Sequence, residues 1–154
     1  MRSQDYDRLY LSPPHLGRHE LNYVHKAIED NWVAPAGPNI TGFEADICQA
    51  AGVGHCVALA SGTAAIHLGL ILLGVGPGDE VLCPSFTFVA TANPIRYLGA
   101  TPVFVDINPD TCAIDARRIE EKITARTKVI AAVHFYGLSA DLDPIMEIAR
   151  RHGL

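Results

Sequence analysis

The chain has 154 residues, of which 49% are hydrophobic and only 19% charged, and its net charge is −5. An acidic chain without a basic stripe is not expected to bind nucleic acid or an anionic membrane. The longest apolar stretch, residues 64–75, is too short to span a bilayer, and the charged residues 1–11 do not resemble a secretory signal. The four cysteines are scattered without a C-x-x-C pair, which is typical of reduced thiols in a cytoplasmic protein.

The first fifty residues predict two helices connected by loops. Residues 1–18 contain two prolines and a glycine, which favours an extended arm. Apolar residues recur with helical spacing over 19–31, and they predict an amphipathic helix. A Pro- and Gly-rich loop over 32–39 then separates this helix from a second one over 41–51.

From residue 55 onward, strand-like and helix-like segments alternate. This order is typical of βαβ units, in which a mostly parallel sheet carries helices on both faces, so the predicted fold class is α/β. Polar residues that follow the strands should gather at the carboxyl edge of the sheet, where such folds bind ligands. We expect strands at 55–60, 80–83, 102–105 and 128–134, and helices at 63–73, 88–98, 115–123 and 142–152.

The junction Ser61-Gly62-Thr63, between the first expected strand and its helix, is the most informative local motif. The start of a helix leaves backbone N–H groups unpaired and carries partial positive charge, and a glycine there lets a ligand approach the backbone. These features suit a phosphate group. From the segment alone, an equally good explanation is that Ser61 or Thr63 simply caps the helix.

Three other features have a structural explanation beside a functional one. Phe88 follows a strand and could stack on a planar ring, although a core position is the commoner role for such an aromatic residue. His134 ends the last strand at the expected ligand edge, and it is the best functional candidate of the seven histidines. Asp106 is better explained by a turn with Asn108-Pro109-Asp110, and no cluster has the spacing of a metal site.

The glycines of Gly74-x-Gly76-x-Gly78 superficially match a dinucleotide-binding fingerprint. The fingerprint follows a strand and opens a helix, whereas this segment follows a helix and precedes a strand. We therefore expect a tight helix-to-strand turn and no nicotinamide cofactor.

Seven segments, in order, resemble the DegT/DnrJ/EryC1/StrS family of pyridoxal-phosphate-dependent sugar aminotransferases. The resemblance covers nearly all of the chain from residue 11. It implies the N-terminal part of an aspartate-aminotransferase-like large domain of fold type I, with residues 1–40 as arm, helix and substrate loop and 41–154 as an incomplete cofactor-binding domain. The segments are LSPPH (11–15), NWVAPAGP (31–38), ASGTAA (60–65), GPGDEV (76–81), PSFTFVAT (84–91), GATPVFVD (99–106) and HFYG (134–137).

The resemblance also implies roles for particular residues. Ser61, Gly62 and Thr63 would bind the phosphate of pyridoxal 5′-phosphate, and Phe88 would stack on its pyridine ring. The nucleotide-sugar site, which in this family lies at a dimer interface, would be lined by residues Asn31, Trp32, Val33, Ala34, Gly62 and His134.

The LSPPH and NWVAP segments are most similar to the branch that aminates the 4-keto group of UDP-linked 4-keto-6-deoxy sugars. The implied reaction moves an amino group from glutamate to the sugar and yields a UDP-4-amino-4,6-dideoxy sugar for cell-surface polysaccharides or glycans. The implied partners are the nucleotide sugar, the amino donor and a second subunit, which is either an identical copy or a complementing chain.

The family's Schiff-base lysine, and the aspartate that pairs with the pyridine nitrogen, lie beyond the matched segments. Lys26, Lys122 and Lys128 stand outside the family's lysine context, so no catalytic residue is carried over. We therefore expect the chain alone to be inactive, and oligomeric or poorly soluble because an incomplete sheet exposes an edge strand and apolar surface. The alternatives are a non-catalytic truncated paralogue that binds phosphate or a nucleotide sugar, and a related sugar dehydratase with histidine in place of the lysine.

Overall fold

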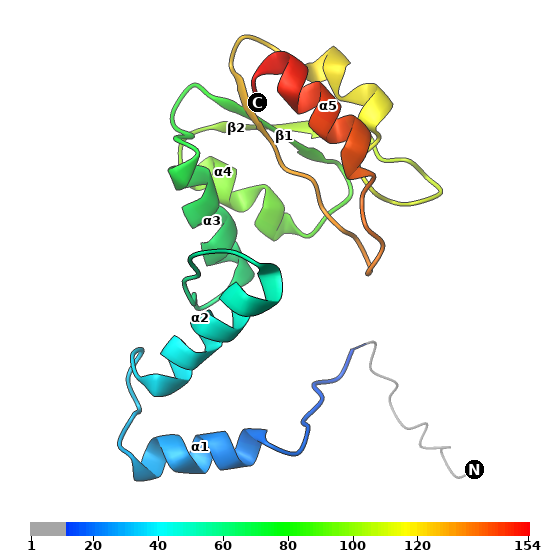
Figure 1. The fold of residues 1–154 in the computed structure, drawn as a ribbon. Coiled ribbons are helices and arrows are strands. Elements are labelled where there is room, and N and C mark those ends of the chain that lie inside the picture. Colours follow the sequence, from blue (N-terminus) through cyan, green and yellow to red (C-terminus); the bar gives the residue numbers. More distant parts are fainter. Residues whose placement is uncertain (1–11) are drawn as a thin grey trace, which may run out of the picture. The chain divides into compact units, whose positions relative to one another are not determined.

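The computed structural model describes residues 12–154, and these fall into two compact units, 12–58 and 59–154. The expected arm over residues 1–18 lies mostly outside the described residues, and the expected boundary at residues 40 and 41 stays a prediction. In the first unit, helix α1 spans Glu20–Glu29 and helix α2 spans Pro38–Ala51 (Figure 1). Both helices were predicted, although α2 begins three residues earlier because Pro38 can occupy the first turn of a helix.

Helix α1 ends in a motif that the sequence encodes locally. Asn31 adopts the left-handed conformation, with φ of 59°. The N–H of Trp32 donates to the carbonyl of Ala27 at 2.7 Å, and the N–H of Asn31 donates to that of Ile28 at 3.1 Å. This pair of bonds is a Schellman cap, which asparagine tolerates better than most residues. Asn31, a predicted substrate residue, thus also has a structural role.

The second unit is built on a parallel sheet of three strands in the order β2-β1-β3. Its elements, in chain order, are α3 (Gly62–Leu72), β1 (Glu80–Pro84), η1 (Val89–Thr91), α4 (Asn93–Tyr97), β2 (Thr101–Val105), η2 (Ala116–Arg118), η3 (Glu120–Lys122), β3 (Thr127–Ile130) and α5 (Leu142–His152).

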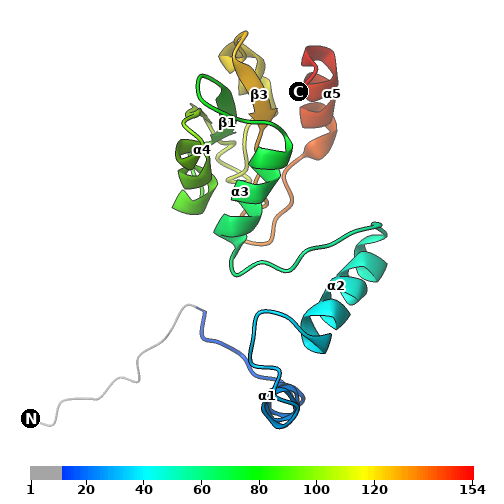
Figure 2. The same ribbon diagram turned by 90° about the vertical axis from the view of Figure 1, so that its left-hand side faces the viewer.

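Helices cover both faces of this sheet, as the sequence predicted. Figure 2 shows β1 and β3 between α4 on one side and α5 on the other, and α3 packs in the same apolar cluster as α4. Successive side chains of a strand point to opposite faces. Val81 and Cys83 therefore pack with Leu70 and Ile95 under α3 and α4, whereas Leu82 packs with Ile145 under α5.

The glycine-rich segment between α3 and β1 is the expected helix-to-strand turn. Gly74 and Gly78 have φ of 70° and 92°, a region that glycine enters without steric cost. The Asp79 carboxylate accepts a hydrogen bond from the N–H of Gly76 at 2.9 Å, which closes the turn. The segment thus follows a helix and precedes a strand, which is the reverse of the order in a dinucleotide-binding fingerprint.

The predicted strand over 55–60 was wrong. A strand is defined by a ladder of hydrogen bonds to a neighbour, and no described strand pairs with these residues. The N–H of Ala58 instead donates to the side chain of Glu44 on α2, at 2.8 Å. The apolar pattern of this segment indicates that its side chains prefer to be buried, but it does not determine whether a neighbouring strand is available to pair with it.

Two predicted helices and one predicted strand were longer than the observed elements. The helix expected over 88–98 is split into η1 and α4, because Pro94 has no N–H to continue a helix and instead occupies the first turn of a new one. The helix expected over 115–123 consists of the two 3-10 turns η2 and η3. Strand β3 ends at Ile130 rather than at residue 134, since its neighbour β1 ends at Pro84, which has no ladder donor.

Candidate ligand cavity at the N-terminus of helix α3

A cavity of about 390 Å³ lies at the N-terminus of α3 and at the carboxyl edge of the sheet. Four of the predicted site residues line this one cavity: Gly62, Thr63, Phe88 and His134. They come from three segments that are far apart in the sequence: the start of α3, the loop after β1 and the loop after β3. Its other lining residues are Ile66, Thr87, Ala90, Thr91, Val133 and Phe135.

The start of α3 combines the two roles that the sequence left open. Ser61 caps the helix, because its hydroxyl accepts a hydrogen bond from the N–H of Ala64 at 3.2 Å. The N–H groups of Gly62 and Thr63 have no hydrogen-bond partner among residues 12–154. A cap and a site for an anion therefore coexist on the same turn.

Not every predicted site residue lies at this cavity. Ser61 does not line it, and its hydroxyl is used by the cap. Residues 31–34 belong to the first unit, so their role in a substrate site stays a prediction. Trp32 packs locally against Gly37, where an added Cβ would lie only 2.8 Å from the indole Cε3 atom.

Phe88 presents its ring to solvent, with 74% of its surface exposed. The core role that is common for an aromatic residue after a strand is therefore wrong here. Thr87 and Thr91 also line the cavity, and their hydroxyls are 2.9 Å apart. Sequence reasoning gave these threonines no role, although their spacing of four residues was a signal that both could face one site.

No residue that lines the cavity carries a formal charge, apart from the titratable imidazole of His134. The Nδ1 atom of His134 accepts a hydrogen bond from the N–H of Ala140 at 3.0 Å, and it lies 3.4 Å from the hydroxyl of Ser139. A bound anion would therefore meet backbone and imidazole N–H donors rather than a lysine or arginine.

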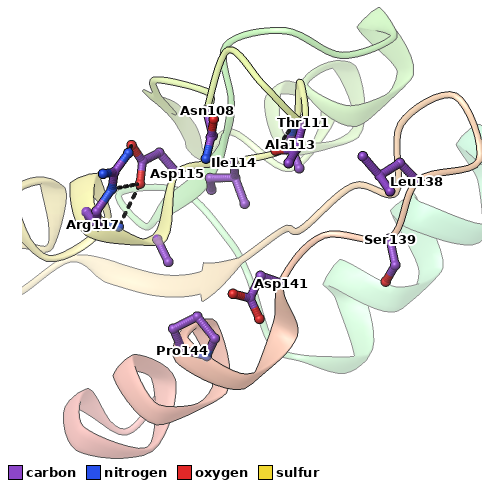
Figure 3. Close-up of a pocket in the computed structure, with 11 residues that line it drawn as sticks. Asn108, Thr111, Ala113, Ile114, Asp115, Arg117, Leu138, Ser139, Asp141 and Pro144 are labelled. Carbon is purple, nitrogen blue, oxygen red and sulfur yellow. Dashed lines mark hydrogen bonds and ion pairs between the residues drawn. The ribbon is translucent and has the colours of Figure 1, made fainter.

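A second cavity, of about 330 Å³, lies between the residues after β2 and the start of α5 (Figure 3). Asp115 and Arg117 form a bidentate pair on its wall, with Nε–Oδ1 and Nη2–Oδ2 distances of 2.9 and 2.8 Å. The hydrogen bonds from Arg117 hold the pKa of the Asp115 carboxyl below its usual value. The turn predicted after Asp106 is confirmed, since Asn108 Oδ1 accepts from the N–H of Asp110 at 2.9 Å.

No group of three or more His, Cys, Asp and Glu residues within 12–154 could hold a metal ion. No helix in that same part of the chain is long and apolar enough to cross a membrane.

Comparison with known proteins places these features in a family. The chain is 45% identical over 150 residues to GDP-perosamine synthase of Caulobacter vibrioides, and the match covers 97% of this chain and 40% of that protein. It is 43% identical over 155 residues to EpsN of Bacillus subtilis, a provisionally assigned pyridoxal phosphate-dependent aminotransferase, with the same coverage. The chain thus spans about 40% of the length of these curated relatives.

The fold agrees with solved structures of such enzymes. The crystal structure of NtdA from Bacillus subtilis with bound cofactor PMP matches 87% of this chain and 31% of that chain, with 40% sequence identity and a TM-score of 0.83. A family model for the DegT/DnrJ/EryC1/StrS aminotransferase family matches residues 14–154. The chain belongs to the DegT/DnrJ/EryC1/StrS aminotransferase family.

Proposed function

We propose that this chain forms the phosphate- and ring-binding part of a pyridoxal-phosphate-dependent aminotransferase that acts on a nucleotide sugar. The observation that carries the proposal is the cavity where the free N–H groups of Gly62 and Thr63 meet the exposed ring of Phe88. Family membership and the names of the relatives support the same reaction class. The amino donor is glutamate, and the protein acts in the cytoplasm.

The residues present fit pyridoxal phosphate. A phosphate dianion matches two free N–H groups at the positive end of a helix dipole. No atom lies within 4 Å of the position where Gly62 would carry a Cβ, so the backbone is open to a ligand. The exposed ring of Phe88 supplies a flat face for a pyridine ring.

Each part of the cavity has a distinct task in this proposal. The amides of Gly62 and Thr63 hold the phosphate, and Phe88 fixes the plane of the pyridine ring. Ile66 and Val133 line the cavity with apolar surface, which limits the access of water to the reacting atoms. When bound, pyridoxal phosphate supplies the carbonyl carbon that carries the amino group from donor to acceptor.

The acceptor in this proposal is the 4-keto group of a 4-keto-6-deoxy sugar linked to a nucleoside diphosphate. The LSPPH and NWVAP segments favour UDP as the carrier, whereas the name of GDP-perosamine synthase favours GDP. Residues 31–34 would contact the nucleotide sugar, and a second subunit, either an identical copy or a complementing chain, would complete the site.

The proposed phosphate-binding site at the N–H groups of Gly62 and Thr63 is tested by removing one N–H group without removing the helix. Gly62 is the first residue of α3 and follows Ser61 in extended conformation, so proline is compatible with both positions. Gly62→Pro should weaken binding of pyridoxal 5′-phosphate by about 10- to 100-fold, the value of a hydrogen bond to a charged group. Gly62→Ala keeps the N–H and is the matched control. Equal binding of pyridoxal 5′-phosphate by the two variants would contradict the proposed phosphate-binding site.

The reaction is tested with glutamate, pyridoxal phosphate and either UDP- or GDP-linked 4-keto-6-deoxy sugar, with mass spectrometry of the product. Lys26, Lys122 and Lys128 do not line the cavity, so we expect the chain alone to give no amino sugar. Borohydride should likewise fix no pyridoxyl group to these lysines. Turnover by the chain together with such a labelled lysine would overturn the assignment of the cavity.

A further inference from the structure

The tautomer of His134 follows from one hydrogen bond. A backbone N–H can only donate, so the Nδ1 atom that accepts from Ala140 at 3.0 Å must present its lone pair. The hydroxyl of Ser139 lies 3.4 Å from the same nitrogen and donates to the carbonyl of Ala140 at 3.1 Å. The neutral imidazole therefore carries its proton on Nε2.

The loop that supplies this hydrogen bond is a tight turn with specific backbone requirements. Tyr136 and Gly137 have φ of 50° and 84°, and the N–H of Leu138 donates to the carbonyl of Phe135 at 3.0 Å. A turn with two successive positive φ values reverses the chain sharply. It brings Ala140, which is buried in the core under α5, back to the imidazole.

His134 and its neighbour Ser139 line different cavities. His134 lines the cavity with Gly62, Thr63 and Phe88, whereas Ser139 lines the second cavity beside α5 (Figure 3). The Nδ1 lone pair of His134 is taken by the Ala140 N–H, so Nε2–H is the ring donor that is left for a ligand. No other side chain that lines the His134 cavity has a nitrogen donor.

We propose that His134 has two separable functions: its Nδ1 fixes the loop over residues 135–140, and its Nε2–H donates a hydrogen bond to a ligand oxygen in the cavity. This inference rests on the proposed function, because the ligand is either the cofactor or the keto sugar. Both offer oxygen acceptors. The Ala140 N–H is then a positioning group, which acts on the ligand through the imidazole.

A pair of substitutions separates the two functions in the native protein. The Oδ1 atom of asparagine can replace Nδ1, so His134→Asn should keep the bond to Ala140 and lose the ligand donor. The side-chain amide of glutamine reaches the position of Nε2, so His134→Gln should keep a ligand donor and lose the bond to Ala140.

Two measurements test the two functions in these variants. Hydrogen exchange of the Ala140 amide should be unchanged in His134→Asn and clearly faster in His134→Gln. Binding of pyridoxal 5′-phosphate, and separately of the UDP- and GDP-linked keto sugars, should fall about tenfold or more in His134→Asn for the ligand that accepts from Nε2, and fall less in His134→Gln. Comparison of these ligands identifies whether the cofactor or the sugar is the acceptor.

The ring nitrogens provide an independent check. Long-range ¹H–¹⁵N spectra of the native protein should show His134 with a protonated Nε2 and an unprotonated Nδ1 whenever the ring is neutral. The opposite tautomer, or equal loss of all ligands in both variants, would overturn the inference. If the native protein binds none of these ligands, the proposed function and the ligand half of the inference both fail, whereas a correct tautomer with unchanged binding in His134→Asn refutes the inference alone.

Discussion

At the scale of single residues, the buried polar groups of the second unit are satisfied by specific partners. Glu80 is buried at the start of β1, where Thr124 Oγ1 donates to its Oε2 at 2.6 Å and Arg126 Nε donates to its Oε1 at 3.0 Å. The hydrogen bond from Thr124, together with the Arg126 pair, holds the pKa of Glu80 below its ordinary value of 4.5. This network links the N-terminal ends of β1 and β3, at the opposite edge of the sheet from the cavity.

The lowered pKa of Glu80 gives a prediction about acid stability. A carboxyl group whose pKa is lower in the folded state contributes stability above its unfolded pKa, and this contribution disappears as pH falls through the folded pKa. Glu80→Gln should lower stability at neutral pH and flatten the loss of stability below about pH 4.5, measured by urea unfolding between pH 3 and 7. Glu147→Gln removes an exposed carboxylate and is the control. If Glu80→Gln loses stability at acid pH as steeply as the native protein, protonation of Glu80 does not cause that loss.

Burial also sets the reactivity of one cysteine. Cys83 is fully buried on β1, and burial raises the pKa of its thiol to about 11. A thiol of this kind is protonated at neutral pH, and only the thiolate is a nucleophile. Cys83 is therefore a core residue of the sheet and not a candidate catalytic group, although it lies one residue before the end of β1.

At the scale of elements, the loop between α1 and α2 depends on a close approach of an aromatic ring to the backbone. Gly37 has φ of 127°, and a Cβ there would lie 2.8 Å from Trp32. Pro38 then begins α2 directly after this glycine. The NWVAPAGP segment thus encodes a defined loop conformation, and Trp32 is the one tryptophan of the chain.

Gly37→Ala should displace Trp32 and strain this loop. The clash with the indole adds to a backbone penalty of roughly 1–3 kcal/mol for a residue with a Cβ at this φ of 127° and ψ of −179°. We expect a change in the emission maximum and in the quenching of the tryptophan fluorescence, because the half-exposed ring of Trp32 loses its packing against Gly37. Gly42→Ala, in α2, meets no atom within 4 Å and should leave the emission unchanged. Identical spectra for Gly37→Ala and the native chain would contradict the packing described.

At the scale of the whole chain, the two units differ in how much they bury. No residue within 12–58 is buried, whereas the second unit contains two clusters of buried apolar residues on the two faces of its sheet. Burial of apolar side chains is the main favourable contribution to folding. Most of the stability of the chain is therefore expected to come from residues 59–154.

The exposed apolar face of α1 predicts self-association of the chain. Leu21, Val24 and Ile28 recur with helical spacing and expose 67%, 53% and 61% of their surfaces. Contiguous apolar surface of this kind favours association. Light scattering should show oligomers, and Leu21→Glu combined with Ile28→Glu should shift them to smaller species. Asn22→Glu adds charge on another side of the helix and is the control, and a stable monomer of the native chain would contradict this expectation.

The sequence by itself determined the features that depend on neighbours a few residues away. The cap at Ser61, the glycine turn before β1, the amphipathic helix α5 and the ordered family motifs could all be identified from local pattern. The grouping of Gly62, Thr63, Phe88 and His134 at one cavity was also predictable. Strand ends converge on one edge of a parallel sheet, so the pattern of strands already implied this grouping.

Only the tertiary structure decided the features that need a distant partner. Residues 55–60 have a strand-like pattern but no ladder, and β3 stops at Ile130, which pairs with Leu82 of β1 shortly before Pro84. The bond between the Ala58 N–H and the Glu44 side chain is equally invisible in the sequence, because Glu44 lies on α2, 14 residues before Ala58. A local pattern fixes what a segment can do, whereas hydrogen-bond partners from elsewhere in the chain fix which of those options it adopts.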